Sequence, residues 1–280
     1  MVKSMWIGNK EFSIGNRTYI MGILNVTPDS FSDGGQHNQL DRALYHAEQM
    51  IKEGADIIDV GGESTRPNYT QISEEEEIAR VTPIIEAIKE NWDIPISIDT
   101  YKSKVAGAAC QAGADLVNDI WGLKYDEAMA GVIKEHNAAV CIMHNRKTDQ
   151  YKEYFKEFMQ DMKEAIEIAK KAGIADNKIM IDPGIGFAKT YEMNLSTTNR
   201  LEIMKKFGYP ILLGTSRKSM IGNALDLPVT ERLEGTIATS VIGVMKGCHF
   251  IRVHDVKENL RAVRMTEAIL NSSLFDYNNI

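Results

Sequence analysis

The strongest constraint on this chain is an alternation, repeated eight times, of short β-rich runs with longer amphipathic stretches. The runs are expected strands at residues 19–25, 57–60, 95–99, 116–119, 139–144, 178–182, 211–215 and 250–254. Helical periodicity lies between them, as at residues 40–53, 74–91, 151–172 and 229–246. Strands that alternate with helices in this way are typical of an α/β protein with a parallel sheet.

The number of βα units favours a closed (β/α)8 TIM barrel over a doubly wound open sheet. No linker or change of composition interrupts the 280 residues, and such barrels commonly use roughly 250 residues as one domain. We therefore expect a single domain over residues 1–280. Two turn signals, Gly8-Asn9 and Gly15-Asn16, precede the first expected strand. They indicate a short β-hairpin-like segment that closes the bottom of the barrel.

Charge and composition exclude several classes of function. The net charge of -7 argues against non-specific nucleic-acid binding, which needs a basic surface. No apolar run approaches the roughly 18 residues of a membrane span, and no signal peptide is evident, so a cytoplasmic protein is expected. The three cysteines are widely spaced within apolar runs, which predicts reduced core thiols. An anionic substrate would need a local cluster of cations.

Polar residues end almost every expected strand. In a (β/α)8 barrel these positions surround the ligand site, and polar groups that converge on an apolar interior are costly unless a ligand bonds to them. For Asp59 and Asp119, a capping role is an equally supported alternative. The polar strand ends are Asn25, Asp59, Asp99, Asn118, His144, Asp182, Thr215 with Ser216, and Arg252 with His254.

Side-chain alternation along a strand selects among these residues. Arg252 and His254 are two positions apart and share a face, whereas His249 faces the other way and is expected to be structural. By the same parity, only one of Asn118 and Asp119 can face the lumen. A small heterocycle with adjacent N–H donors and ring acceptors would suit Asp99, Asn118 and Asp182.

A phosphate site is expected after the seventh and eighth strands, where barrels of this class often bind anions. The seventh strand continues into Gly214-Thr-Ser-Arg-Lys-Ser219, and the eighth ends at Arg252 and His254. We expect Lys218 and Arg252 to have functional roles. For Arg217, a functional role and a solvent-facing position are equally supported.

Two long loops follow the first two strands, at residues 27–36 and 61–67, and both contain Gly and Pro. They carry Phe31, Asp33, Thr65 and Arg66 toward the expected mouth of the barrel. Because two such loops occur together, we interpret them as lids.

At these residues the chain resembles the dihydropteroate synthase family, over about residues 19–254. The matching motifs are Asn25-Val-Thr-Pro-Asp-Ser-Phe-Ser-Asp-Gly-Gly35, Asp59-Val-Gly-Gly-Glu-Ser-Thr-Arg-Pro67, Ser97-Ile-Asp-Thr100, Asn118-Asp-Ile120, Asp182-Pro-Gly-Ile-Gly-Phe187, Gly214-Thr-Ser-Arg-Lys218 and Arg252-Val-His254. The resemblance implies a transferase of folate biosynthesis. It would condense 6-hydroxymethyl-7,8-dihydropterin diphosphate with 4-aminobenzoate, giving 7,8-dihydropteroate and pyrophosphate. Mg2+ as cofactor, a homodimer and inhibition by sulfonamides are also implied.

The resemblance assigns a role to individual residues. The catalytic set would be Asp99, Asp182, Lys218, Arg252 and His254. Asp99, Asn118, Asp182 and Lys218 would hold the pterin. Asn25, Arg252 and His254 would meet the diphosphate, and Asn25 would also ligate Mg2+. The aminobenzoate side would be formed by Phe31, Thr65, Arg66, Pro67, Phe187, Lys218 and Ser219. Asp33, Met143 and Gly214 complete the expected substrate-binding set.

The chain departs from the family pattern at two places. Asn68 stands where Gly commonly follows Arg-Pro, and Met143-His144-Asn145 is a looser match at the end of the fifth strand. The geometry of the second loop and the role of His144 therefore stay open.

Two other functions compete with this interpretation. A methyltetrahydrofolate-dependent methyltransferase would share the Asp and Asn residues that hold the pterin, but it would not need the cationic site. A non-catalytic pterin-binding relative would bind without turnover. No Ser or Cys nucleophile with a positioned base is evident, so we expect direct substitution at carbon without a covalent enzyme intermediate.

Overall fold

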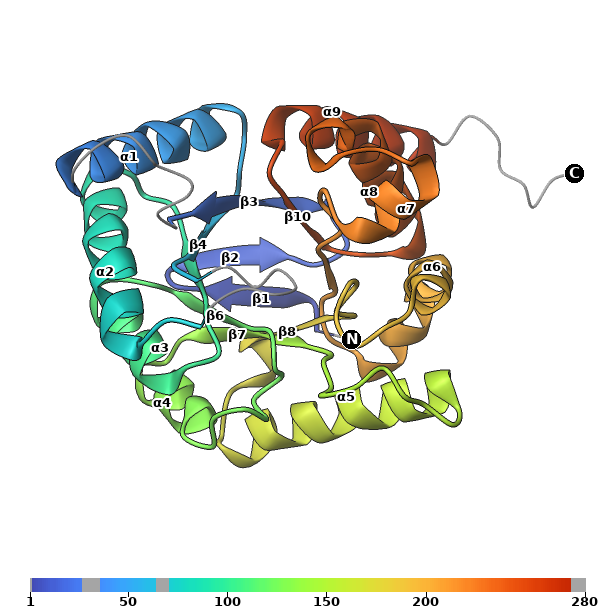
Figure 1. Cartoon of the computed structure of the whole chain (residues 1–280), viewed down its shortest axis with the longest axis horizontal. Helices are drawn as coiled ribbons and strands as arrows, with labels where there is room; N and C mark the ends of the chain where they lie inside the picture. The colour runs from blue at the N-terminus through green and yellow to red at the C-terminus, as the bar shows by residue number, and fades with distance from the viewer. Residues whose placement is uncertain (1, 27–35, 64–70, 273–280) are drawn as a thin grey trace, which may run out of the picture.

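Strands lie at the centre of the molecule and helices form a ring around them (Figure 1). The computed structural model describes residues 2–26, 36–63 and 71–272. The predicted site residues Phe31, Asp33, Thr65, Arg66 and Pro67 lie outside these ranges, as does Asn68.

The central sheet is a closed parallel barrel, as predicted. Its hydrogen-bonded order is β8-β7-β6-β5-β4-β3-β10-β9, and a parallel bridge between Ile181 and Ile211 joins the two ends. The strands are β3 (Tyr19–Asn25), β4 (Ile57–Gly61), β5 (Ile96–Asp99), β6 (Leu116–Asp119), β7 (Ala139–Met143), β8 (Ile179–Asp182), β9 (Leu212–Leu213) and β10 (Phe250–Val253).

Helices connect successive strands and cover the outside of the barrel (Figure 1). They are α1 (Gln36–Lys52), α2 (Glu74–Asn91), α3 (Ser103–Gln111), α4 (Met129–Glu135), α5 (Tyr154–Lys171), α6 (Tyr191–Asn199), α7 (Ser219–Leu225), α8 (Leu233–Lys246) and α9 (Val256–Leu270). The outer core between the helices and the barrel includes Leu24, Val60, Ile98 and Ile142, which are fully buried. Within the described residues, no helix has the length and apolarity to span a bilayer.

A β-hairpin closes the bottom of the barrel, as predicted. Strand β1 (Ser4–Ile7) pairs antiparallel with β2 (Lys10–Ser13), and Gly8 turns between them with φ +59°. Met5, Ile7 and Phe12 of the hairpin pack against the first inward-facing residues of the barrel strands. That cluster also contains Tyr19, Met21, Ile57, Leu116, Ala139, Cys141, Met180, Leu212 and Phe250. The lumen is therefore apolar at its N-terminal end, and any polar site must lie at the other end.

Two expected elements differ in extent. The seventh strand pairs with β10 only at Leu212 and Leu213, where its partners are Phe250 and Ile251, and with β8 through the bridge from Ile211 to Ile181. The chain therefore leaves the sheet earlier than the expected end at residue 215. The amide of Lys218 donates to the carbonyl of Thr215, which starts a turn there. The expected helix at 229–246 is divided into a 3-10 turn, η4 (Val229–Glu231), and helix α8.

Candidate active site

Polar side chains converge at the C-terminal ends of the barrel strands. On most strands the inward-facing residue near the bottom is apolar, and the inward-facing residue two positions later is often polar, as Leu116 and Asn118 show; on β5 both Ser97 and Asp99 are polar. We call the resulting group the mouth cluster. It consists of Asp59, Asp99, Asp182, Lys218 and Arg252.

Arg252 organises the mouth cluster. Its Nε lies 2.6 Å from Oδ2 of Asp59, and its Nη2 lies 2.6 Å from Oδ2 of Asp99. The Asn118 amide also lies 3.4 Å from Oδ2 of Asp59. Within the described part of the chain, the buried Oδ1 atoms of Asp59 and Asp99 have no hydrogen-bond partner. Buried oxygens of this kind are ready to accept N–H donors from a ligand.

The mouth cluster contains three carboxylates and two cations, so it keeps one uncompensated negative charge when all five groups are ionised. Burial raises the pKa of Asp99 to about 7, although Arg252 opposes this shift and Asp59 adds to it. Burial also disfavours the charged guanidinium of Arg252, but the charges of Asp59 and Asp99 outweigh that effect and raise its pKa. A ligand that donates N–H groups to these carboxylates would offset this unfavourable burial of charge.

Asp182 and Lys218 form the second half of the mouth cluster. Oδ1 of Asp182 accepts from the Gly184 amide at 2.6 Å, while burial raises the pKa of this carboxyl. Burial lowers the pKa of Lys218 to about 8, partly offset by Asp182. The Lys218 ammonium donates to the carbonyl of Ile185. The two opposite charges thus face each other across the end of β8.

Two glycines lie beside the polar groups. A methyl group on Gly214 would lie 3.7 Å from Oδ2 of Asp182 and 3.9 Å from Cβ of Arg252. A methyl group on Gly61 would lie 3.7 Å from both Oδ1 of Asn25 and Cβ of Asp99. These distances place Asn25 next to the mouth cluster.

The loops after β9 and β10 meet at His254. Its Nδ1 lies 2.9 Å from Oγ of Ser216, and its amide donates to the same oxygen at 3.2 Å. Ser219, another predicted contact, is exposed at the start of α7. Arg217 instead forms an ion pair with Asp255 through Nη2 and Nε, at 2.5 and 3.1 Å.

An apolar group lies at the ends of β5 to β8, and it meets the mouth cluster where Phe187 contacts Lys218. It contains Met143 and Phe187, two predicted substrate contacts, together with Tyr101, Ile120 and Trp121. The Lys218 ammonium lies 4.8 Å from the centre of the Phe187 ring, a cation–π contact. A flat ring could therefore lie between an apolar wall and the charged groups.

The structure resolves the alternatives left open at two aspartates. Asp59 is fully buried in the lumen and holds Arg252, so the capping alternative was wrong for this residue. Asp119 does cap a turn, because its carboxylate accepts from the amides of Trp121 and Leu123 at 2.8 and 2.7 Å. The parity prediction that only one of Asn118 and Asp119 would face the lumen is thereby confirmed, and the residue that does so is Asn118.

His249 and His144 contact residues outside the mouth cluster. His249 accepts from the Ile211 amide through Nδ1 at 3.1 Å, as its parity predicted. His144 is buried against Phe158, with ring centres 4.5 Å apart, and its Nε2 lies 3.1 Å from Asp161. His144 therefore points away from the mouth cluster.

Sequence reasoning missed a buried ion-pair network beside the second long loop. The Lys102 ammonium donates to Glu63 at 2.8 Å, to Glu77 at 2.7 Å and to the carbonyl of Ile72 at 2.8 Å. Tyr101 donates to the other oxygen of Glu63 at 2.6 Å. The network holds together the chain at residues 63 and 72, on either side of the loop that carries the predicted aminobenzoate contacts. Its partners are 25 to 39 positions apart, so no local motif signals it.

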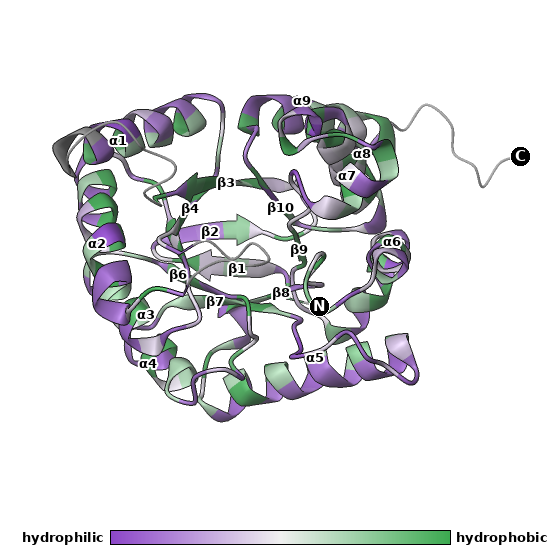
Figure 2. Cartoon of the chain, in the orientation of Figure 1, coloured by the Kyte–Doolittle hydropathy of each residue, from purple (hydrophilic) through white to green (hydrophobic). Residues whose placement is uncertain are grey.

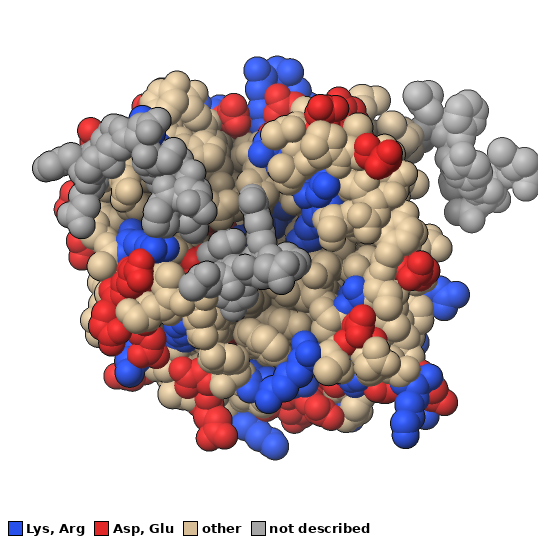
Figure 3. Space-filling model, in the orientation of Figure 1, with Lys and Arg blue, Asp and Glu red and all other residues tan. Residues whose placement is uncertain are grey.

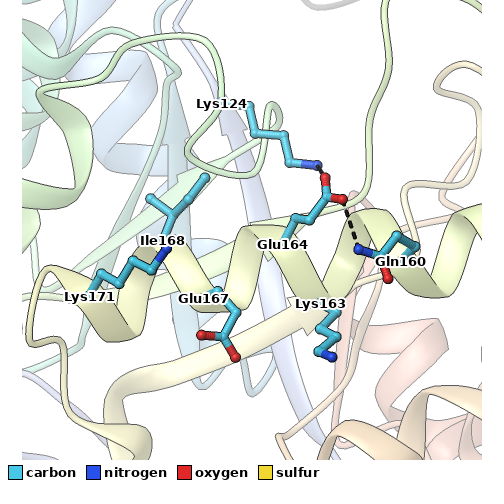
Figure 4. A pocket seen from close by; sticks show the side chains of 7 residues that line it. All are labelled: Lys124, Gln160, Lys163, Glu164, Glu167, Ile168 and Lys171. Carbon is cyan, nitrogen blue, oxygen red and sulfur yellow. Dashed lines mark hydrogen bonds and ion pairs between the residues drawn. The ribbon is translucent and has the colours of Figure 1, made fainter.

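On the face seen in Figure 3, a few Lys and Arg side chains lie near the middle of the helical ring, beside α7, and others lie with Asp and Glu around the rim. A separate hollow of about 490 Å³ lies along the outer surface of α5, between Lys124, Gln160 and Lys171 (Figure 4). It is lined by surface side chains of both charges, with a 3.5 Å ion pair between Lys124 and Glu164. It therefore lacks the buried polar convergence of a catalytic site.

Asn25 fits one form of magnesium site. No three His, Cys, Asp or Glu side chains converge as a metal site among the residues that the structure describes. Mg2+ does not require such a set when it is bound through substrate phosphates, because one or two protein oxygens then suffice. The Asn25 side-chain oxygen at the end of β3 is a donor of this type.

The chain matches known pterin-binding enzymes over most of its length. The family model described as "Pterin binding enzyme" covers residues 21–254. A dihydropteroate synthase of Clostridium beijerinckii is 64% identical over 95% of this chain and 99% of its own. A crystal structure of the Clostridium difficile enzyme, in the presence of pteroic acid, has a TM-score of 0.91 at 53% identity, over 93% of this chain and 100% of that one. A Xanthomonas albilineans dihydropteroate synthase with 4-aminobenzoic acid has a TM-score of 0.92 at 34% identity, over 97% and 100%.

The raised pKa of Asp99 predicts a pH dependence of stability. The pKa of Asp99 is about 7 in the folded protein, against an ordinary value of 3.8. The contribution of Asp99 to the free energy of unfolding is therefore fully present below about pH 4, and it is lost as the pH rises toward 7. Asp99→Asn cannot ionise, so its free energy of unfolding should fall less over this range, by on the order of 2 to 4 kcal/mol. Urea denaturation of the ligand-free protein between pH 4.5 and 7.5 measures the difference.

The matched control is Asp93→Asn, which changes an exposed carboxylate that pairs with Lys10 at the bottom of the barrel. This variant should follow the wild-type pH profile. Parallel profiles for wild type and Asp99→Asn would contradict the burial of an ionisable Asp99.

Proposed function

Because the chain belongs to the dihydropteroate synthase family of pterin-binding enzymes, we propose that the mouth cluster is the site where it condenses the pterin diphosphate with 4-aminobenzoate. The contact of Arg252 with both Asp59 and Asp99 carries this proposal, because it places an anion-binding cation beside the heterocycle-binding carboxylate of Asp99 at the C-terminal ends of the barrel strands. We infer that residues 1–280 act as one pterin-binding barrel domain.

Four predicted residues would hold the pterin ring. Asp99 and Asp182 would accept N–H donors of the heterocycle, and the Asn118 amide can both donate and accept. Lys218 would cover the ring from the side of Phe187, with which it already makes a cation–π contact. Gly214 lies beside both Asp182 and Arg252, so its backbone would border the bound ring.

Arg252, His254 and Asn25 would bind the diphosphate. The guanidinium carries five N–H donors, and its bonds to Asp59 and Asp99 use those on Nε and Nη2. Arg252 can therefore stay fixed by the carboxylates while it offers its remaining donors to phosphate oxygens. We assign Asp59 the task of orienting Arg252. A Mg2+ ion held by Asn25 and the diphosphate would supply further neutralisation of the leaving group.

The reaction is a substitution at the exocyclic carbon of the pterin. The bond from this carbon to the diphosphate oxygen breaks, the amine nitrogen of 4-aminobenzoate forms the new bond, and the amine loses a proton. Arg252 and His254 would neutralise the departing pyrophosphate. Asp99 and Asp182 would stabilise positive charge that develops on the ring. The aminobenzoate contacts Phe31, Thr65, Arg66 and Pro67 stay predictions, as do Asp33 and Ser219.

A single assay tests this function. The protein should release pyrophosphate from the pterin diphosphate only when both 4-aminobenzoate and Mg2+ are added. Asp182→Asn removes a charged acceptor, so its kcat/KM for the pterin diphosphate should fall roughly 10- to 100-fold. Asp93→Asn should match the wild type.

The alternatives give different results in the same assay. A methyltransferase would release no pyrophosphate, and a non-catalytic relative would bind the pterin diphosphate without turnover. Release that is independent of 4-aminobenzoate, or full activity of Asp182→Asn, would contradict the proposal.

We further propose that the protein is a homodimer that associates through α8 and α9. Exposed apolar side chains gather on these two helices, including Ile242 and Met245 on α8 and Met265 and Ile269 on α9. Figure 2 shows apolar residues along both helices. An exposed apolar group of this kind is typical of an interaction surface. We keep the cytoplasm as the proposed location, since the three cysteines are free thiols.

Met245→Lys combined with Met265→Lys should convert the dimer into monomers, because each lysine places a charge at the contact. Sedimentation velocity at micromolar protein concentration measures the change. Tyr45→Lys is the control, because Tyr45 is an exposed apolar residue on α1, away from these helices. A monomeric wild type, or a dimer that persists in the double variant, would contradict the proposed interface.

A further inference from the structure

Lys189 makes three contacts that connect the end of β7 with the loop after β8. Its Nζ lies 2.9 Å from Nδ1 of His144, 2.9 Å from the carbonyl of Gly184 and 2.9 Å from the carbonyl of Phe187. Lys189 belongs neither to the predicted site nor to the mouth cluster. Its ammonium group nevertheless contacts the same loop that carries Asp182 and Phe187.

These three contacts determine the state of His144. Burial lowers the pKa of Lys189 to about 7, so the group is an ammonium below this pH. An ammonium group has three protons and no acceptor, so in this state all three protons are used and Nδ1 of His144 accepts. The imidazole proton is then on Nε2, which donates to Asp161 at 3.1 Å. Asp161 also accepts from Nε of Arg146 at 2.5 Å. Burial lowers the pKa of His144 to about 4, in agreement with a neutral ring.

The loop between Asp182 and Phe187 is held from two sides at Gly184. The amide of Gly184 donates to Asp182 at 2.6 Å, and its carbonyl accepts from Lys189. Gly184 has φ +66°, and a methyl group on it would lie 2.0 Å from the carbonyl oxygen of His144. The backbone of the loop is therefore in close contact with the end of β7, at the point where Lys189 spans the two segments.

We propose that Lys189 is a positioning residue for the pterin site. By holding the carbonyls of Gly184 and Phe187 against His144, it orients the Asp182 carboxylate and the Phe187 ring for the substrate. Without the ammonium group, the two carbonyls and Nδ1 of His144 lose their shared donor, and the loop can move relative to β7. The inference rests on the proposed role of Asp182 in pterin binding.

The first test is Lys189→Met, which keeps most of the side-chain length and removes the donors. The KM for the pterin diphosphate should rise roughly 10- to 100-fold, with a smaller change in kcat, because displacement of a binding group by about 1 Å has effects of this size. Steady-state kinetics with saturating 4-aminobenzoate measures both constants. The control is Lys178→Met, which removes a lysine that donates to the Asn137 carbonyl just before β8, at the other end of this strand.

Thermal unfolding of the same variants separates positioning from stability. A purely structural lysine would lower the Tm and leave the KM of the folded enzyme unchanged, and that result would overturn the proposal. A KM that rises in Lys189→Met and stays at the wild-type value in Lys178→Met supports it.

Two substitutions of His144 provide a second test. His144→Asn keeps an acceptor near the position of Nδ1, so the bond from Lys189 is retained. His144→Gln keeps a donor near the position of Nε2, so the bond to Asp161 is retained and the one to Lys189 is lost. The proposal predicts the larger increase in KM for His144→Gln, although Gln fills more of the space. Equal increases, or the opposite order, would contradict it.

Asp182→Asn distinguishes the failure of this inference from the failure of the proposed function. Titration calorimetry with 6-hydroxymethylpterin as the probe should show weakened binding for both Asp182→Asn and Lys189→Met. Unchanged affinity in Asp182→Asn would show that the site assignment is wrong. Weak binding in Asp182→Asn with unchanged affinity in Lys189→Met would overturn only the role of Lys189.

Discussion

The Arg252 guanidinium lies between Asp59 and Asp99, and the arrangement of the barrel mouth depends on this interaction. It joins Arg252 of β10 to Asp59 of β4 and to Asp99 of β5, which lie 193 and 153 positions earlier in the chain. Two carboxylates cannot be fully neutralised by one guanidinium, so negative charge remains in a buried place. The Arg252 guanidinium also has N–H donors that its bonds to Asp59 and Asp99 do not use. The interaction therefore prepares the mouth both for a ring that donates N–H groups and for an anion.

Along β10 and β8, the inward-facing residue near the bottom of the barrel is apolar and the inward-facing residue two positions later is charged. On β10, Phe250 packs at the bottom of the lumen, Arg252 lies in the mouth cluster and His254 follows two positions later. Met180 and Asp182 on β8 repeat the change from apolar to charged. The hairpin closes the apolar end with its own side chains. The apolar side chains that pack in the barrel and the polar side chains of the site thus lie at opposite ends of the same strands.

Much of this architecture was predictable because the information is local. Side-chain parity placed Arg252 and His254 on one face of their strand and identified His249 as structural, since alternation depends only on neighbouring positions. It also limited the lumen-facing residue of the next pair to one of Asn118 and Asp119. The role of Asp59 was not predictable in the same way, because an aspartate at a strand end serves equally well as a cap. Only its distant partner distinguishes the two roles. The length of β9 was also missed, since it depends on where β10 stops pairing with it.

The contacts of Lys189 and Lys102 were likewise not predictable from the sequence, because they depend on distant partners. In the sequence, each is a lysine close to the start of a helix, a position where lysines are commonly solvated. Their acceptors come from other loops and strands, and only the folded chain brings them together. Lys189 connects the loop that carries Asp182 and Phe187 to the end of β7, and Lys102 connects Glu63 with Ile72 and Glu77. They extend the candidate site beyond the residues that a family motif identifies.

The most direct test of the proposed pterin site is a crystal structure of this protein with 6-hydroxymethylpterin bound. We expect the N–H groups of the heterocycle to lie within hydrogen-bond distance of Asp99 and Asp182, with Asn118 beside the ring and Lys218 over its face. A pterin bound away from these side chains, with the mouth cluster unchanged, would contradict it.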